Sequence, residues 1–252
     1  MSTTTGLKEN LVHSIISNHW PYPYRSKCGI IPSGEYSVYM DDFYLAPTTN
    51  ALPGTTAIID VGATVVAAET DAISYSGVLK FASDAVSEGA TVYWPKGIQL
   101  GLGQKFFMEC RVNTASAAGT DVQFGLSALT AVVNPEDVWT TAATDLISFG
   151  VLSGDSTVTM LCDKNNSGST AQLGTIDLVD ATWHTLGIEV TGTAANSTMS
   201  VKGYVDGELA ITWSGETTIP DDLALAPFIG FRTGAAAGNI GYFDYVRWSI
   251  QR

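Results

Sequence analysis

The sequence predicts an all-β protein, an antiparallel sandwich or barrel that is preceded by an extended N-terminal arm. From Val38 onward apolar and polar residues alternate in short runs, and this period of two places successive side chains on opposite faces of a strand. Clusters of Gly, Ser, Asn, Asp and Pro separate the runs, as tight turns require. No stretch repeats at the helical period over a helical length, so about a dozen strands are expected.

The alternating runs give the expected strands in chain order. One turn is especially clear, because Asp206-Gly207 separates two runs and is a strong hairpin signal. The expected strands are Val38–Leu45, Gly77–Ser83, Ala90–Trp94, Lys105–Asn113, Asp121–Ala128, Leu146–Leu152, Thr157–Asp163, Trp183–Val190, Met199–Val205, Glu208–Trp213, Pro227–Arg232 and Asn239–Ile250.

The last of these strands alternates along its whole length. A strict period of two puts one set of its side chains on one face of the sheet and the rest on the other. The first set is Ile240, Tyr242, Asp244, Val246 and Trp248, and the opposite set includes Tyr245 and Arg247.

Length and charge narrow the class of protein. A chain of 252 residues is long enough for one large β-domain whose core needs no disulfide or metal. Its 12 basic and 25 acidic residues give a formal net charge of −13, which argues against nucleic acid and against an anionic membrane surface as partners. We find no secretory signal and no apolar run near the roughly 18 residues that a membrane helix needs, so we expect no membrane partner.

The three cysteines indicate neither a disulfide framework nor a zinc site. Cys28, Cys110 and Cys162 are odd in number and far apart, and no CxxC pair occurs. Cys110 alternates with apolar residues on its strand, so we expect it to be a small buried hydrophobe, as free cysteines often are. This pattern is typical of a protein made in a reducing compartment.

Residues 1–37 differ in texture from the rest and form the expected arm. Within them, Trp20-Pro21-Tyr22-Pro23-Tyr24-Arg25 alternates proline with aromatic residues, which favours an extended backbone that cannot join a central strand. The side chains of Trp20, Tyr22, Tyr24 and Arg25 would project from this stiff segment, and they are the candidate partner-binding residues. The surface that they contact is either the chain's own sandwich or a neighbouring subunit.

A family resemblance appears in the second half of the chain. The segments Thr182–Ile188, Val201–Leu209, Phe228–Phe231 and Gly241–Trp248 resemble, in this order, the concanavalin A-like lectin/glucanase (laminin-G-like) jelly roll. That family typically shows a Trp-His opening to a strand, a Val-Asp-Gly turn and a closing strand of the form F-D-x-V-R. The resemblance implies a two-sheet antiparallel jelly-roll sandwich over residues 38–252. It also implies that the first strand, near Asp41–Tyr44, lies beside the last.

Glucan-cleaving members of this fold place three carboxylates at alternate positions on one strand. A retaining mechanism needs the two reacting carboxylates roughly 5–5.5 Å apart, which alternation on one face supplies. In this sequence Glu69-Thr70-Asp71 has no third member, and Asp206-Gly207-Glu208 belongs to a turn. Glu109 and Glu189 each stand alone on their strands. We therefore expect no catalytic residues and no enzymatic activity.

A metal or cofactor is not expected either. The loop Asp163–Gly168 offers oxygen ligands suited to calcium, but Asn, Ser and Gly are also what a hairpin loop requires, and Lys164 opposes a divalent ion. His13, His19 and His184 are scattered, and we expect His184 to be structural.

The favoured function is a non-enzymatic part of a virion. A signal-less, acidic β-sandwich with an aromatic arm looks like the decoration or cement proteins of bacteriophage capsids, which assemble in the host cytoplasm and lie on the capsid surface. The expected partner is then the major capsid protein or another virion subunit, bound through aromatic and Arg anchors. A homo-oligomer is also expected.

The alternative is a carbohydrate-binding, lectin-like module that mediates attachment to cell-surface glycans. Such a module would carry exposed aromatic residues on one face of a sheet. The fold alone does not distinguish between the two functions.

Overall fold

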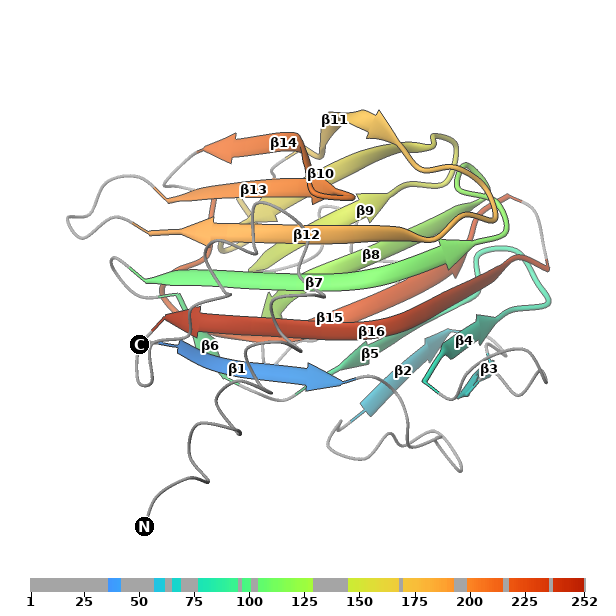
Figure 1. The fold of residues 1–252 in the computed structure, drawn as a ribbon, viewed down its shortest axis with the longest axis horizontal. Helices are drawn as coiled ribbons and strands as arrows, with labels where there is room; N and C mark the ends of the chain where they lie inside the picture. Colours follow the sequence, from blue (N-terminus) through green and yellow to red (C-terminus); the bar gives the residue numbers. More distant parts are fainter. Residues whose placement is uncertain are drawn as a thin grey trace, which may run out of the picture.

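The computed structural model describes residues 36–41, 57–61, 65–68, 77–94, 97–100, 104–128, 145–167, 170–192, 199–214, 218–235 and 238–251. In this part of the chain the regular structure consists of sixteen β-strands in two antiparallel sheets, A and B (Figure 1). None of the described segments forms a helix with the length and hydrophobicity needed to cross a membrane.

Sheet A has the strand order β14-β13-β12-β7-β16-β4-β3, and β1 pairs with β16 beside this path. Its central strands are the longest, so they offer the widest continuous surface. The bounds of its strands are β1 Tyr36–Asp41, β3 Val65–Ala68, β4 Leu79–Ala82, β7 Lys105–Thr114, β12 His184–Thr191, β13 Ser200–Val205, β14 Glu208–Ser214 and β16 Ile240–Gln251.

Sheet B has the order β11-β10-β9-β8-β15-β5-β2, with β6 paired to β15. The two sheets lie one behind the other in Figure 1, with β7 and β16 of sheet A in front of β8 and β15 of sheet B. The bounds of its strands are β2 Ala57–Val61, β5 Gly89–Tyr93, β6 Ile98–Gln99, β8 Thr120–Ala128, β9 Leu146–Val151, β10 Thr157–Asp163, β11 Gln172–Asp177 and β15 Ala224–Thr233.

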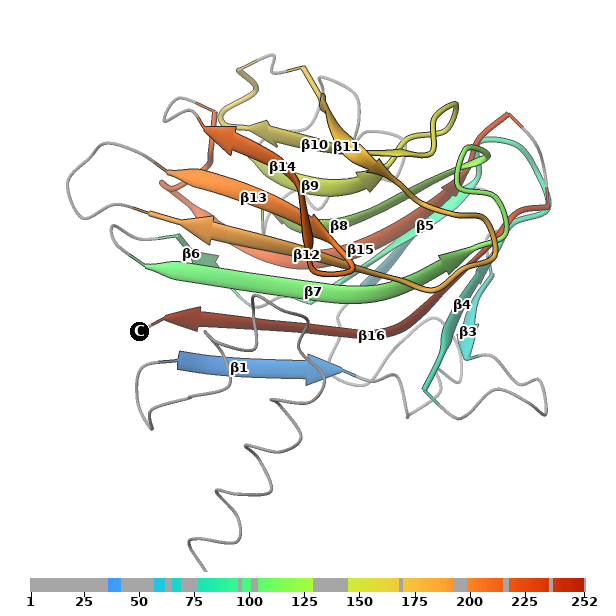
Figure 2. The ribbon, with the colours of Figure 1, turned by 45° about the horizontal axis from the view of Figure 1, so that its top comes forward.

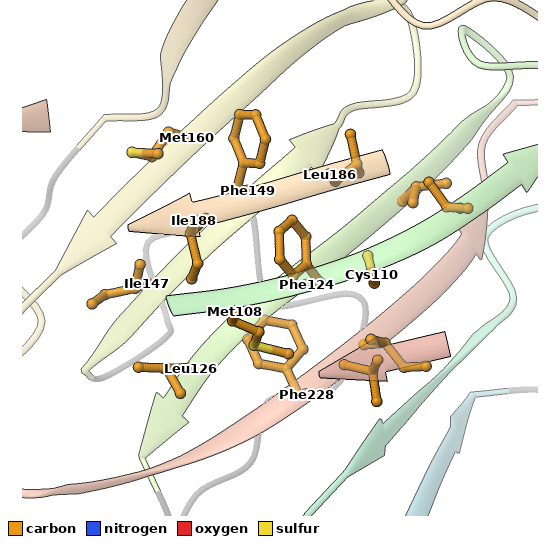
Figure 3. Close-up of a cluster of buried hydrophobic side chains, with 14 of the residues drawn as sticks. Met108, Cys110, Phe124, Leu126, Ile147, Phe149, Met160, Leu186, Ile188 and Phe228 are labelled. Carbon is orange, nitrogen blue, oxygen red and sulfur yellow. The ribbon is translucent and has the colours of Figure 1, made fainter. Parts of the chain in front are cut away.

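The hydrophobic core fills the space between the sheets. Alternate residues of each central strand point into it, as the period of two predicts, and the residues between them form the outer faces. Figure 3 shows Met108 of β7 and Ile188 of β12 among side chains from sheet B such as Phe124 and Phe149. Cys110 is fully buried in the same cluster, so its expected role as a small hydrophobe is confirmed.

The chain ends and the hairpin follow the prediction. β1 pairs antiparallel with β16, from Tyr36 opposite Gln251 to Asp41 opposite Val246, and Figure 2 shows the two strands side by side. At the turn between β13 and β14, Asp206 has a φ of 50° and Gly207 a φ of 87°. Two consecutive positive φ angles are the mark of the type I′ hairpin that Asp-Gly favours.

The expected alternation of the last strand is wrong in its first half. Phe243 lies opposite Val112 and Val246 opposite Cys110, so Asp244 and Tyr245 together face a single residue of β7 and the register shifts between them. This β-bulge inserts one residue and reverses the alternation. Tyr242 therefore lies on the outer face with Tyr245, whereas Trp248 lies in the core.

Four strands were not predicted. β2 and β3 are short runs in which apolar and polar residues do not alternate, and β6 has two residues, too few for a period to be read. β11 is an edge strand that is mostly exposed, with only Gly174 and Ile176 half-buried, and its sequence lacks the regular apolar alternation of a half-buried strand.

Candidate functional site

The residues predicted to bind a partner lie outside the described part of the chain. Trp20, Tyr22, Tyr24 and Arg25 precede β1, which begins at Tyr36. Their role, and the choice between the chain's own sandwich and a neighbouring subunit, stays a prediction. Within the described residues, the surfaces open to a ligand are the two outer faces of the sandwich and the loops that border them.

Hydrogen bonds join the Trp-His opening to the Val-Asp-Gly turn. His184 Nδ1 lies 2.7 Å from Asp206 Oδ2, and the Val179 N–H donates to His184 Nε2 at 2.9 Å. Because Nε2 accepts, Nδ1 carries the proton and donates to the carboxylate. The Thr185 N–H also donates to Asp206 Oδ1 at 2.8 Å. These contacts give the two motifs a structural role, because they hold the start of β12 to the turn between β13 and β14.

The loop after β10 binds its own polar groups. Lys164 forms an ion pair with Asp221 and lies 3.7 Å from Asp222. Asp163 Oδ1 accepts hydrogen bonds from the Ser167 N–H at 2.6 Å and from its hydroxyl at 2.8 Å. Within the described ranges no group of three or more His, Cys, Asp or Glu side chains is placed to hold a metal ion. The ammonium group of Lys164 thus lies beside the carboxylates of Asp221 and Asp222, where a metal cation would otherwise bind.

The outer face of sheet B carries buried hydroxyl groups. Thr91 on β5 and Ser148 on β9 are 0% exposed, and Ser127 on β8 is 1% exposed. Their hydroxyl oxygens have no hydrogen-bond partner in the described structure. Such groups are rare in native proteins, and water or a ligand is the usual explanation when they occur.

Glycines lie between the polar side chains of this face. In one row across five adjacent strands, the neighbours are Thr159, Gly150, Gln123, Gly230 and Thr91. A Cβ added at Gly230 would lie 3.2 Å from the Cγ of Gln123 and 3.3 Å from the Oγ1 of Thr91. Glycine at this position therefore leaves the two polar groups unobstructed by the strand between them.

Charged groups stand only at the two ends of the described part of this face. At one end Asp121 accepts from the Ser153 N–H at 2.6 Å and lies 3.6 Å from Arg232. Burial raises the pKa of Asp121 above its ordinary value, against the effect of these two donors. At the other end Asp163 is level with Ser127, because both lie opposite Leu146. The space between is lined by uncharged groups.

The outer face of sheet A carries a buried ion pair at its centre, where the outer face of sheet B has uncharged groups. Glu109 on β7 and Arg247 on β16 lie opposite each other, form an ion pair and are 0% and 2% exposed. The Tyr245 hydroxyl donates to Glu109 Oε1 at 2.6 Å. Burial raises the pKa of Glu109 from its ordinary 4.5 to about 7, although Arg247 and Tyr245 both lower it. Its Oε2 has no partner in the described part of the chain.

Two glutamates that each stand alone in sequence are neighbours in space. Glu109 lies opposite Gly187 of β12, and Glu189 is two residues further along that strand on the same face. The Tyr204 hydroxyl donates to Glu189 Oε2 at 3.0 Å, and burial together with this carboxylate raises the pKa of Tyr204. Both carboxylates are thus held by tyrosines and are buried, so neither faces an open substrate site.

No protein-family model matches the chain, and no curated protein matches it in sequence. Solved structures do match its fold. An endo-1,3-beta-glucanase from Streptomyces sioyaensis aligns with a TM-score of 0.59 and 14% identity, covering 88% of this chain and 98% of that one. The metal-free form of lectin I-B4 from Griffonia simplicifolia aligns with a TM-score of 0.54 and 12% identity, covering 85% and 99%.

A third match is an endo-beta-1,4-glucuronan lyase from the fungus Trichoderma reesei, with a TM-score of 0.55 and 13% identity, covering 83% of this chain and 94% of that one. At these identities the likeness shows the fold alone. The concanavalin A-like jelly-roll fold that the sequence motifs implied is therefore confirmed.

Sequence reasoning missed the hydroxyl groups of sheet B. Ser127 and Ser148 alternate with core residues on β8 and β9, which places them outside the core but does not show that they are buried or unbonded. Thr91 sits in the run Gly89–Tyr93, where a β-branched residue looks like ordinary strand composition. The weak available signal was the repeated pairing of Gly with Ser or Thr on neighbouring strands.

Proposed function

We propose that this chain is a carbohydrate-binding, lectin-like module that holds a sugar chain on the outer face of sheet B and does not cleave it. The observation that carries the proposal is the set of three buried, unbonded hydroxyls of Thr91, Ser127 and Ser148. They lie on one face of the sheet and on three different strands, and they are 0–1% exposed, so a ligand that bonds them must displace whatever covers this face.

The energetics of a buried hydroxyl favour such a ligand. Leaving one without a hydrogen bond costs about 1–3 kcal/mol, and this cost is recovered when a ligand hydroxyl or a bridging water completes the bond. Ligand sites in proteins are mostly apolar, with a few polar groups that fix orientation. The uncharged row from Thr159 to Thr91, with glycines between its polar members, supplies orienting polar groups without charge, which suits neutral sugars.

Structures of this fold are found among sugar-binding proteins. A further match, with a TM-score of 0.54 and 11% identity, is a lectin called UEA-II in complex with galactose. This recurrence supports sugar binding as a use of the fold, and the residues of this chain carry the specific proposal.

The separation of the carboxylates on this face supports binding without hydrolysis. Asp121 and Asp163 stand at opposite ends of the described face, six residues apart along β8 when Asp163 is placed level with Ser127. Six residues of a strand span about 20 Å. Glycoside hydrolysis needs two carboxylates roughly 5–10 Å apart, with either stereochemical outcome. Asp121 and Asp163 therefore cannot act as such a pair.

The test is calorimetric titration of the full chain with uncharged oligosaccharides, after a glycan array has selected the best of them. We expect millimolar or tighter binding and no release of new reducing ends on long incubation. The variant Ser83→Ala is the matched control, because the Ser83 hydroxyl is bonded to Glu88 at 3.0 Å and its loss should leave binding unchanged. Absence of binding to every neutral sugar would overturn the proposal, and release of reducing ends would overturn its non-catalytic part.

A second proposal is that the chain serves as a capsid decoration or cement protein, bound to the major capsid protein on a virion surface. Its support is the net charge of −13, which disfavours contact with packaged DNA, and the aromatic arm with Trp20, Tyr22, Tyr24 and Arg25. Both functions are compatible, since a decoration protein that binds glycans helps a particle adhere to cells.

Deletion of residues 1–35, which stops just before β1, tests the virion role. We expect a folded sandwich that no longer co-sediments with purified shells, and size-exclusion chromatography of the full chain to show a homo-oligomer. Normal decoration of shells by the truncated chain would rule out the arm as the anchor.

A further inference from the structure

A strip of half-exposed aromatic and cationic side chains crosses one end of the outer face of sheet A. Tyr242 of β16 lies opposite Lys80 of β4 on one side and opposite Asn113 of β7 on the other. Trp183, the residue before β12, continues the row, with its ring centroid 6.5 Å from that of Tyr242. The β-bulge of β16 is what brings Tyr242 to this face.

Each ring of the strip holds a cation. Lys80 Nζ lies 5.9 Å from the centroid of the Tyr242 ring, and the guanidinium carbon of Arg111 lies 4.9 Å from that of Trp183. A cation over an aromatic face is attracted by the ring and loses part of its freedom. The two positive charges are therefore held in place on the surface. Their backbone positions are two strand spacings and two residues apart, about 12 Å.

Arg111 retains capacity to bind a further acceptor. Arg111 donates to Asp244 at 2.8 Å, but both side chains are open to solvent, with 42% and 32% exposure. Exposed ion pairs of this kind stabilise a protein little, so a ligand carboxylate exchanges with Asp244 at little cost. A guanidinium stacked on a ring keeps its in-plane N–H groups free to make bidentate bonds with planar anions.

We propose that this strip binds an acidic oligosaccharide, one whose sugar rings carry carboxylate or sulfate groups. Charge complementarity supplies the anchor: the Arg111 guanidinium binds one anionic group of the ligand, and Lys80 adds a second positive charge to the same strip. The apolar faces of the sugar rings pack on Trp183 and Tyr242, while Asn113 offers an amide to ring hydroxyls.

The position of the strip selects a sugar over other anions. An acidic peptide that binds by strand addition needs an unpaired edge, whereas the strip lies across β4, β16 and β7, strands that are paired on both sides. Nucleic acid needs many clustered cations, and a chain of net charge −13 repels a dense polyanion. A short acidic glycan needs only the two cations present.

The surface is distinct from the one in the proposed function. It lies on the other sheet, and its charged groups favour acidic sugars where the row on sheet B favours neutral ones. The two proposals therefore fail separately: variants of Ser127 and Ser148 should leave acidic binding intact, and variants of the strip should leave neutral binding intact.

The experiment is calorimetric titration of the full chain with three oligosaccharides: a uronic acid oligomer, a sulfated oligomer and a neutral oligomer of the same linkage as the first. We expect at least one acidic oligosaccharide to bind the strip about tenfold more tightly than the neutral one does. The affinity of this acidic ligand should fall with added salt. The double variant Lys80→Gln/Arg111→Gln should remove this acidic preference, and Trp183→Ala should weaken acidic binding at least tenfold.

Lys202→Gln is the matched control, a lysine on β13 of the same sheet but opposite Glu189 and away from the strip, and it should change nothing. Thermal unfolding of each variant shows whether it is folded. Equal binding of acidic and neutral oligomers by the unaltered chain, or unchanged acidic affinity in the folded double variant, would overturn the proposal.

Discussion

The outer faces of the two sheets differ in how their buried polar side chains are bonded. At the centre of sheet A, Glu109 is bonded to Arg247 and Tyr245, and Glu189 to Tyr204. On sheet B the buried hydroxyls of Thr91, Ser127 and Ser148 have no partner in the described structure, whereas that of Thr159 bonds within its own strand. Both faces belong to strands of similar length in one sandwich, so the difference lies in side chains and not in architecture.

This difference separates stability from binding. A buried group that is bonded within the protein contributes to folding, and its loss leaves a partner unsatisfied. A buried hydroxyl without a partner costs stability and is useful only when something else binds to it. Substitutions on sheet A should therefore reduce the free energy of unfolding, whereas matched substitutions on sheet B should reduce ligand affinity instead.

The largest effect is expected at the buried ion pair. Arg247→Leu leaves Glu109 buried without its counter-charge, and at pH 8 the free energy of unfolding should fall by about 3–5 kcal/mol. Chemical denaturation measures it. The double variant Glu109→Met/Arg247→Met, which removes both charges, should lose much less. If Arg247→Leu is as stable as the unaltered chain, the pair is not structural and the contrast between the faces fails.

The pH dependence of stability isolates Glu109. Its pKa is about 7 in the folded chain against 4.5 ordinarily, so the folded state binds the proton more tightly than the unfolded state. The resulting stabilisation is fully present below pH 4.5 and is lost as the pH rises through 7. It amounts to about 3 kcal/mol, at 1.36 kcal/mol for each unit of pKa.

Glu109→Gln should abolish this slope, because the amide does not titrate. Denaturation curves between pH 5 and pH 8 for both proteins make the comparison. The same slope in the variant would assign the pH dependence to another group.

A smaller effect is expected from a single hydroxyl of sheet A. Tyr204→Phe removes the donor to Glu189 and should lower the free energy of unfolding by about 1–3 kcal/mol, since a buried carboxylate oxygen loses its partner. Sugar binding should not change. Unaltered stability in this variant would show that bonded and unbonded hydroxyls are equivalent here.

The fold was largely predictable and the candidate site was not, for physical reasons. Alternation and the Asp206-Gly207 turn reflect local chemistry, so they are visible in sequence. The bulge near Asp244 shifts the register by one residue, and nothing in the local pattern marks it. Glu109 and Glu189 become neighbours only through strand pairing. The solitary Glu109 of the sequence thus gave no sign of its pairing with Arg247.

The hydroxyl groups show a further limit of sequence reasoning. Whether Ser127 or Ser148 has a partner depends on the strands next to it and on what covers the face, neither of which is local. The Trp-His and Val-Asp-Gly motifs illustrate the reverse case. They were visible at once and supported the fold, and the structure explains them by the bond between His184 and Asp206.

The most direct test of sugar binding on sheet B is the double variant Ser127→Ala/Ser148→Ala, measured for both stability and neutral oligosaccharide affinity. We expect affinity to fall about tenfold or more, as loss of two hydrogen bonds predicts, while the free energy of unfolding stays equal or rises. Lower stability with unchanged affinity would contradict the account, because the two hydroxyls would then serve the fold and not a ligand.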